Sequence, residues 1–233
     1  RSPGFQFLQR GGYIRPLASG EISFLPAGVK ARNRIARLIT SALTQVGGQE
    51  MASPMVQSVD LNPAAKAAGV RFRDRSQREV VLARSHLTAV LAAAGGTIQS
   101  YRQLPAVLFE QWRRYAEGDR GAGGLFGQRE TETIECCSLH ATEMDLDEFY
   151  PRMRAAIEEM FARCDLPVIA VKASLPAASA LGSYSFVLPH AAGTDAIVLC
   201  DGCGYAATQS TAITRKPEPE REDALPLEDV ETP

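Results

Sequence analysis

The feature that most constrains the fold of this chain is the spacing of apolar residues over 28–46. Apolar side chains recur there every three or four positions, and basic side chains fill much of the first half of the segment. This period is that of an α-helix with one apolar face. Gly47-Gly48 follows, and glycine tolerates the left-handed turn after a helix. We therefore predict a helix over 28–46 and a strand over 50–57. The apolar positions are Ile35, Leu38, Ile39, Ala42, Leu43 and Val46.

Two further helices are predicted. Over Asp145–Arg163 one face is apolar, and Asp145 with Glu148 resembles a capping box. Pro151 marks either the start of the regular helix or a kink in it. A shorter helix is predicted over Ser85–Ala94, with Ser85 as the N-cap.

Short apolar runs predict the strands. Val107–Tyr115 and Leu125–Cys137 surround a glycine-rich loop at 118–124, whereas 60–78 is predicted to be irregular. Later runs predict strands of one antiparallel sheet at Val168–Val171, Phe186–Leu188 and Ala196–Leu199. The pattern as a whole indicates an α+β domain, with an antiparallel sheet flanked by helices.

The composition of the chain and its first residues bear on where in the cell the protein is expected. The apolar fraction is 45%, yet no run of about 18 apolar residues occurs, so no membrane contact is expected. No signal peptide is recognisable and Arg1 is not an initiator methionine, so we expect a fragment. Five cysteines, of which Cys136 and Cys137 are adjacent, favour a reduced, cytoplasmic protein over a disulfide framework.

The net charge of −2 hides a strong asymmetry. Residues 1–120 carry 17 Lys/Arg and 8 Asp/Glu, a balance of +9, and residues 121–233 carry 8 and 19, a balance of −11. The basic half could contact RNA phosphates. Alternatively, two solvated faces neutralise each other, and composition leaves both readings open.

Three segments resemble one protein family. Gln9–Gly20 is similar to its first strand and turn, Glu50–Gln57 is similar to class II motif 1, and Cys200–Ala207 is similar to a segment late in the core. On these residues the chain resembles, over nearly its whole length, the catalytic core of bacterial prolyl-tRNA synthetase, a class II aminoacyl-tRNA synthetase. The resemblance implies a class II core domain over 1–214, with motif 1 at about 28–57 and motif 2 at about 107–137.

The resemblance also implies what surrounds this core. Residues 215–233 hold four prolines and seven acidic residues, so we expect a solvated linker. In the family such a linker leads into an inserted editing domain. On this resemblance we expect the editing domain, motif 3 and the anticodon-binding domain to be missing from this chain. Motif 1 makes the dimer interface of class II synthetases, which implies a homodimer; an ordinary surface helix is the alternative. The implied interface residues are Ile35, Leu38, Ile39, Leu43 and Pro54.

Most side chains that would bind ATP in this family are replaced. Motif 2 of the family ends its first strand with Phe and Arg, places a Glu two residues later, and adds a loop Arg or His and a stacking aromatic. Only the Arg-Glu pair of the second strand is matched. The vestigial ATP-site positions are Tyr115, Ala116, Gly118, Gly127, Arg129, Glu130 and Thr131. A register slip would place Arg114 at the arginine position but would spoil the remaining match. Loss of one charge-stabilising contact commonly costs about 10²–10³ in rate.

The implied amino-acid pocket is altered in the same way. The family's Thr-His-Glu-Glu loop corresponds to Ser85, His86, Leu87 and Thr88, and its later His-Glu pair corresponds to Tyr184 and Ser185. A cyclic secondary ammonium group needs a carboxylate or an equivalent acceptor, and these positions offer none. We interpret the remaining histidine, His86, as a structural side chain.

A metal site is not predicted. Cys200, Cys203, Cys136 and Cys137 could supply four thiolates. However, adjacent residues of a strand point to opposite faces, so Cys136 and Cys137 should not converge. The loop at 118–124 lacks the Lys-Ser/Thr ending of a phosphate loop.

The sequence thus predicts a catalytically inactive prolyl-tRNA synthetase-like pseudoenzyme that acts as a dimeric binding or accessory module, with no catalytic residue and no cofactor. The alternative is a divergent ligase fragment that uses ATP and Mg²⁺ to activate proline or another carboxylic acid. A third hypothesis is weak, salt-dependent contact with tRNA or other RNA.

Overall fold

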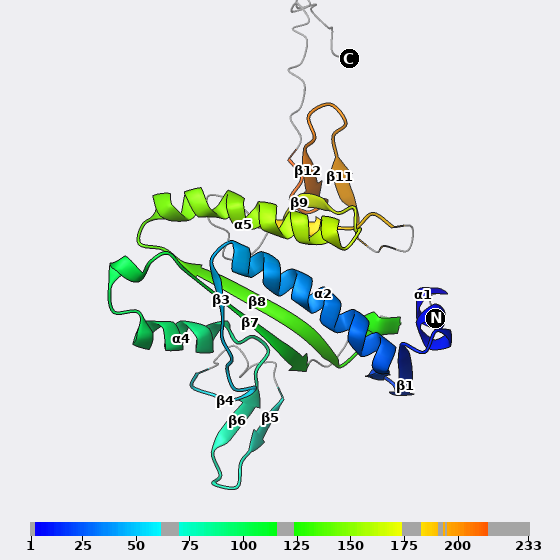
Figure 1. Ribbon diagram of the computed structural model, residues 1–233, viewed down its shortest axis with the longest axis horizontal. Coiled ribbons are helices and arrows are strands. Elements are labelled where there is room, and N and C mark those ends of the chain that lie inside the picture. Colours follow the sequence, from blue (N-terminus) through cyan, green and yellow to red (C-terminus); the bar gives the residue numbers. More distant parts are fainter. Residues whose placement is uncertain are drawn as a thin grey trace, which may run out of the picture. The chain divides into compact units, whose positions relative to one another are not determined.

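A computed structural model describes residues 3–61, 70–115, 124–173, 183–190, 193 and 195–213 (Figure 1). The chain divides into two compact units, Arg1–Leu166 and Pro167–Pro233, and each is described by itself. One core domain over 1–214 stays a prediction, and the predicted linker at 215–233 lies outside the described residues.

The first unit contains both helices and strands. In chain order its elements are α1 (Pro3–Arg10), β1 (Ile14–Ala18), β2 (Glu21–Phe24), α2 (Pro26–Gln45), β3 (Gly48–Glu50), β4 (Val56–Ser58), β5 (Arg71–Arg73), β6 (Glu79–Leu82), α4 (Leu87–Thr97), a 3₁₀ turn η1 (Tyr101–Gln103), β7 (Ala106–Tyr115), a 3₁₀ turn η2 (Gly124–Gly127), β8 (Glu130–Leu139) and α5 (Glu143–Arg163).

Helix α2 confirms the helix predicted over 28–46. Pro26 occupies its first turn, where the missing N–H has no helical partner to lose. Gly47 follows the helix with φ of 93°, a left-handed conformation that glycine accepts readily. At Gly28 a Cβ atom would overlap the carbonyl oxygen of Tyr13, the residue just before β1. Only glycine therefore lets α2 approach this segment so closely.

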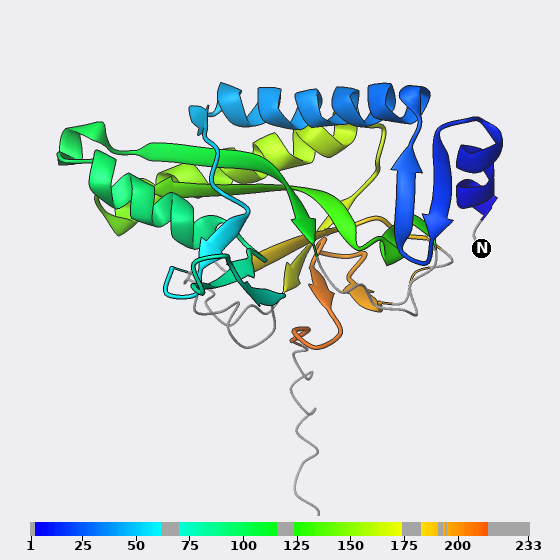
Figure 2. The same cartoon turned by 90° about the horizontal axis from the view of Figure 1, so that it is seen from below.

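The centre of the first unit is the long hairpin of β7 and β8. The strands pair antiparallel from Ala106↔Leu139 to Tyr115↔Glu130, and β3 adds parallel to β7. Helices α2 and α5 lie side by side over one face of this hairpin, and α4 lies on the other (Figures 1 and 2). Because both faces are covered, β7 is buried along most of its length; Val107 and Phe109 are 3% and 2% exposed.

Four local predictions are wrong. The segment 60–78, which was predicted to be irregular, contains strand β5 at Arg71–Arg73. The strand over 50–57 is instead two short strands, β3 and β4, in different sheets; Pro54, which has no N–H to donate, lies between them. Strand β8 begins at Glu130 rather than Leu125, because Gly124–Gly127 forms a 3₁₀ turn. The cap of α4 is His86 rather than Ser85, although Ser85 Oγ accepts a hydrogen bond from Leu87 N–H at 3.2 Å.

Helix α5 also starts differently from the prediction. Its N-cap is Thr142, whose hydroxyl accepts a hydrogen bond from Asp145 N–H at 3.2 Å. The capping box of Asp145 and Glu148 is therefore wrong. The helix begins at Glu143 and continues through Pro151, so that proline does not start it.

The second unit is a four-stranded sheet in the order β10-β9-β12-β11. Its strands are β9 (Ile169–Ala173), β10 (Ser183–Val187), β11 (Ile197–Leu199) and β12 (Ala206–Thr208). Strands β9 and β12 pair parallel, so the expectation of purely antiparallel pairing is wrong here. Val171 and Ala207, both 0% exposed, form its centre. Among the described residues, no helix has the length and apolar content that crossing a bilayer requires.

Candidate functional site

The β7–β8 hairpin sorts the predicted site residues onto two faces. Side chains alternate along a strand, and directly paired residues share a face. The register therefore places Glu110, Trp112 and Arg114, with their partners Glu135, Thr133 and Thr131, on the face that carries α4. The face toward α2 and α5 carries Gln111, Arg113 and Tyr115, with their partners Ile134, Glu132 and Glu130. Thr131 thus shares a face with His86, whereas Tyr115 and Glu130 lie on the opposite one.

On the α4 face, His86 is enclosed in a polar network. Its ring Nδ1 lies 2.8 Å from Glu110 Oε1, and its backbone N–H donates to Glu135 Oε2 at 2.6 Å. Glu110 Oε1 also accepts a hydrogen bond from Ser53 N–H at 2.7 Å, so Nδ1 is the donor of the ring contact. The His86 ring stacks on Trp112 with centroids 3.8 Å apart. His86 is 1% and Glu110 2% exposed, so the imidazole is not presented to a ligand in solution.

Three polar atoms of this network have no hydrogen-bond partner among the described residues: His86 Nε2, Glu110 Oε2 and Trp112 Nε1. A buried polar group without a partner is costly, which makes the network sensitive to any change in its members. The three partners of His86, namely Glu110, Trp112 and Glu135, were not predicted from the sequence. A signal was available for Glu110, because a carboxylate inside the apolar run of β7 is rarely buried without a partner.

The remaining positions of the predicted amino-acid pocket divide between the two units. Leu87 and Thr88 lie in the first turn of α4, both exposed, beside the half-buried Ser85. Tyr184 and Ser185 lie in β10 of the second unit, paired with Lys172 and Val171. None of these side chains is a carboxylate, so the positions offer no charged acceptor for an ammonium group.

Three arginines near the hairpin are paired with glutamates. Arg32 lies 3.6 Å from Glu132, Arg113 lies 3.5 Å from Glu130, and Arg129 lies 3.6 Å from Glu21. The last two pairs are about half exposed and are correspondingly weak. A cavity of about 620 Å³ lies beside β2 and β8, and the charged residues in the described part of its lining are two arginines and two glutamates. The charges of these four side chains balance, so together they offer no excess positive charge for a polyphosphate.

Of the other predicted ATP-site residues, Gly127 ends the 3₁₀ turn η2, and Arg129 stands just before β8. Arg129 N–H donates to the carbonyl of Gly20 at 3.0 Å, which joins this segment to the β1–β2 turn. Ala116 and Gly118 lie outside the described residues.

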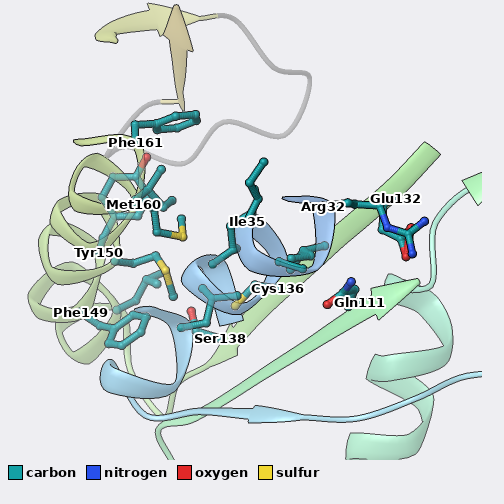
Figure 3. A pocket seen from close by; sticks show the side chains of 17 residues that line it. Arg32, Ile35, Gln111, Glu132, Cys136, Ser138, Phe149, Tyr150, Met160 and Phe161 are labelled. Carbon is teal, nitrogen blue, oxygen red and sulfur yellow. The ribbon is translucent and has the colours of Figure 1, made fainter. Parts of the chain in front are cut away.

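A second cavity, of about 590 Å³, lies between α2, α5 and β8 (Figure 3). Its walls are mainly apolar, and the pair Arg32–Glu132 lies at one end. Three residues of the implied dimer interface, Ile35, Ile39 and Leu43, line it and face α5 within the chain. Leu38 is half-buried, and Pro54 is exposed. Ile35 is still 50% exposed, so its partner in a dimer stays a prediction.

Cys136 and Cys137 lie on opposite faces of β8, as predicted. Cys136, paired with Phe109, lines the apolar cavity, and Cys137 is paired with Leu108. Burial, helped by the neighbouring Cys137, raises the pKa of Cys136 from 9.0 to about 11. The Cys136 side chain reaches solvent through the cavity, yet its apolar surroundings disfavour the thiolate. This cysteine is therefore a poor nucleophile at neutral pH.

The curated proteins that this chain matches include several proline–tRNA ligases. No family model matches the chain. A proline–tRNA ligase of Dehalococcoides mccartyi strain 195 is 31% identical over 234 residues, which cover 98% of this chain and 41% of the ligase. The ligase of Salinispora tropica is 31% identical over 241 residues, covering 100% and 40%. That of Synechococcus sp. strain CC9902 is 34% identical over 232 residues, covering 96% and 38%.

A solved structure has the same fold. The Giardia lamblia prolyl-tRNA synthetase in complex with prolyl-adenylate superposes with a TM-score of 0.67 at 18% identity, covering 78% of this chain and 40% of that one. The chain spans about 40% of the length of the relatives it matches.

Proposed function

Because this chain resembles the proline–tRNA ligases over nearly its whole length and has a class II aminoacyl-tRNA synthetase-like fold, we propose that it is a catalytically inactive counterpart of their core that acts as a dimeric binding or accessory module. A prolyl-tRNA synthetase binds tRNA and ATP. Here the scaffold for such ligands persists while the charges that activate a carboxylic acid do not.

One observation carries this proposal: Arg32, Arg113 and Arg129 each lie within 3.6 Å of a glutamate carboxylate. Amino acid activation brings an ATP phosphate against a carboxylate, so the site needs fixed positive charge that is not already compensated. The replacements at Ala116 and Gly127 remove the cations that the resemblance would place there.

The position of His86 supports the same proposal. Its ring is held by Glu110 and Trp112 and is 1% exposed, which suits a structural role and not proton transfer to a ligand.

The test is proline-dependent exchange of pyrophosphate into ATP, measured beside a complete proline–tRNA ligase as the positive control. We expect no exchange above the blank without enzyme, with either proline or other amino acids. Robust exchange that depends on proline would overturn the proposal.

The module is proposed to be a cytoplasmic homodimer that uses the exposed part of α2. Sedimentation equilibrium tests this directly. Ile35→Glu, at a half-exposed position, should shift a dimer to monomer, whereas Ala31→Glu, exposed on the same helix, serves as the matched control. A monomer at all concentrations would contradict the dimer.

One observation favours the alternative, a divergent ligase fragment. Arg114 shares the α4 face with Trp112, and the ion pairs of the described residues do not include it. If ATP with Mg²⁺ binds there, ATP should raise the melting temperature of the wild-type chain and not that of Arg114→Ala. No shift with ATP, proline or a prolyl-adenylate analogue would favour the inactive module.

A further inference from the structure

The turn between β11 and β12 presents two thiols in a defined geometry. Strand β11 ends at Leu199 and pairs with β12 through Leu199↔Ala206. Cys200 N–H donates to the Tyr205 carbonyl at 2.9 Å, and Gly204 N–H donates to the Cys200 carbonyl at 2.9 Å. Gly204, with φ of 68°, closes the turn. Cys200 and Cys203 are thereby held on one short loop, and both are free and exposed.

The turn places the Cys200 sulfur next to its own backbone, because a Cβ atom built on Gly202 would lie 3.9 Å from it. The neighbouring groups that favour its thiolate are the backbone and side chain of Cys203 and the backbone of Gly202. These groups, the Cys203 backbone first, lower the pKa of Cys200. Cys136 in the same chain shows the opposite behaviour, because its pKa is raised to about 11. Thiolate is the reactive form of cysteine, so Cys200 is the better nucleophile of the two.

Two thiolates alone do not make a zinc site. Structural zinc takes four ligands, and among the described residues no group of three or more His, Cys, Asp or Glu side chains could hold a metal ion. Two exposed thiols three residues apart on one turn, of which one has a lowered pKa, are instead suited to thiol–disulfide exchange.

We propose that Cys200 and Cys203 form a thiol–disulfide exchange site for small-molecule disulfides of the glutathione type. The Cys200 thiolate attacks one sulfur of the disulfide, forms a mixed disulfide and releases one glutathione thiolate, which takes up a proton. Cys203 then loses its proton and attacks the Cys200 sulfur, which releases the second glutathione. The protein dithiol is oxidised to a disulfide, the two electrons reduce the glutathione disulfide to two thiols, and atoms and charge balance.

The proposal does not depend on the proposed function, because the site lies on a turn to which no ligand position was assigned. It also predicts the order of the two thiols: Cys200 attacks and Cys203 resolves.

The experiment treats the reduced, full chain with a series of glutathione disulfide to glutathione ratios, quenches it with acid, alkylates the remaining thiols and maps the peptides by mass spectrometry. Wild type should form a Cys200–Cys203 disulfide and retain no glutathione. Cys203→Ser should trap glutathione on Cys200, and Cys200→Ser should react at least about tenfold more slowly. Cys136→Ser is the matched control and should behave as wild type.

Other outcomes would overturn the assignment. Equal labelling of all five cysteines would show that the turn confers no reactivity. A stable mixed disulfide in wild type would show that Cys203 does not resolve it. Circular dichroism of each variant ensures that a lost reaction is not a lost fold; if Cys200→Ser does not fold, the trapping by Cys203→Ser still decides the order of attack.

Discussion

At the residue scale, Glu110 is the charged group on which the α4 face depends. Its Oε1 accepts from both His86 and Ser53, and the side chain is 2% exposed. Glu110→Ala leaves the buried His86 donor and the half-buried Ser53 N–H without their partner, so we expect unfolding by urea to show a loss of about 3 kcal/mol. Glu130→Ala, whose pair with Arg113 is about half exposed, is the control and should cost less than about 1 kcal/mol. Equal losses would show that the network contributes little.

A second prediction at this scale concerns pH. The folded chain raises the pKa of Cys136 from 9.0 to about 11, so the folded state holds this proton more tightly than the unfolded state. The contribution of Cys136 to the free energy of unfolding is therefore fully present below pH 9 and is lost as the pH rises toward 11. We expect the free energy of unfolding to fall over that window, and to fall less in Cys136→Ser. Cys137, whose pKa is also raised by burial, contributes in the same direction and stays unchanged in the comparison. An identical pH profile in both proteins would contradict the assignment.

Single residues were only partly predictable from the sequence. The replacements at Leu87, Thr88 and Thr131 could be predicted from the sequence, because an alignment with the family's motifs is enough to identify them. The partners of His86 could not be read in this way, because Glu110 and Glu135 lie 24 and 49 positions away and meet it only through the hairpin register. The ion pair Arg32–Glu132 could not be predicted either, because it joins α2 to β8, which are distant in the sequence and meet only in the folded chain.

At the element scale, the space between α2 and α5 offers a test of packing. Ala36 lines the cavity of about 590 Å³, so Ala36→Leu can add apolar contact there without displacing a neighbour. We expect this change to raise the free energy of unfolding by about 1 kcal/mol, measured by urea unfolding. Ala31→Leu, at an exposed position of α2, is the matched control and should change it by less than about 0.5 kcal/mol. Destabilisation by Ala36→Leu would show that the walls cannot accommodate the added atoms.

Elements with a long apolar period were the ones the sequence predicted well. Helices α2 and α5 and strand β7 agree with their predicted ranges to within two residues. The start of β8 was missed, because 125–129 is apolar enough for a strand while the glycines at 124 and 127 bound a 3₁₀ turn. The parallel pairing of β12 with β9 cannot be predicted from the residues of either strand alone. Whether two strands pair parallel or antiparallel depends on the path of the chain that connects them.

At the scale of the whole molecule, the unequal distribution of charge between the two halves of the chain suggests tRNA as a binding partner. Residues 1–120 carry a balance of +9, and Lys30 and Arg34 are exposed on α2. A surface that binds nucleic acid through phosphates releases counterions, so its affinity falls as salt rises. Binding of tRNA should therefore be weak at physiological salt, with a Kd on the order of 10⁻⁴–10⁻⁶ M.

The dependence of tRNA affinity on salt concentration distinguishes binding through phosphates from other kinds of binding. We expect Lys30→Ala/Arg34→Ala to weaken tRNA binding and to reduce the slope of log K against log salt by about two, measured by fluorescence anisotropy. Arg152→Ala/Arg163→Ala removes the same charge from α5, where acidic residues surround it, and should leave the slope unchanged. Binding that does not vary with salt would exclude a phosphate interface. An equal effect of both double variants would attribute any binding to net charge alone and not to the exposed face of α2.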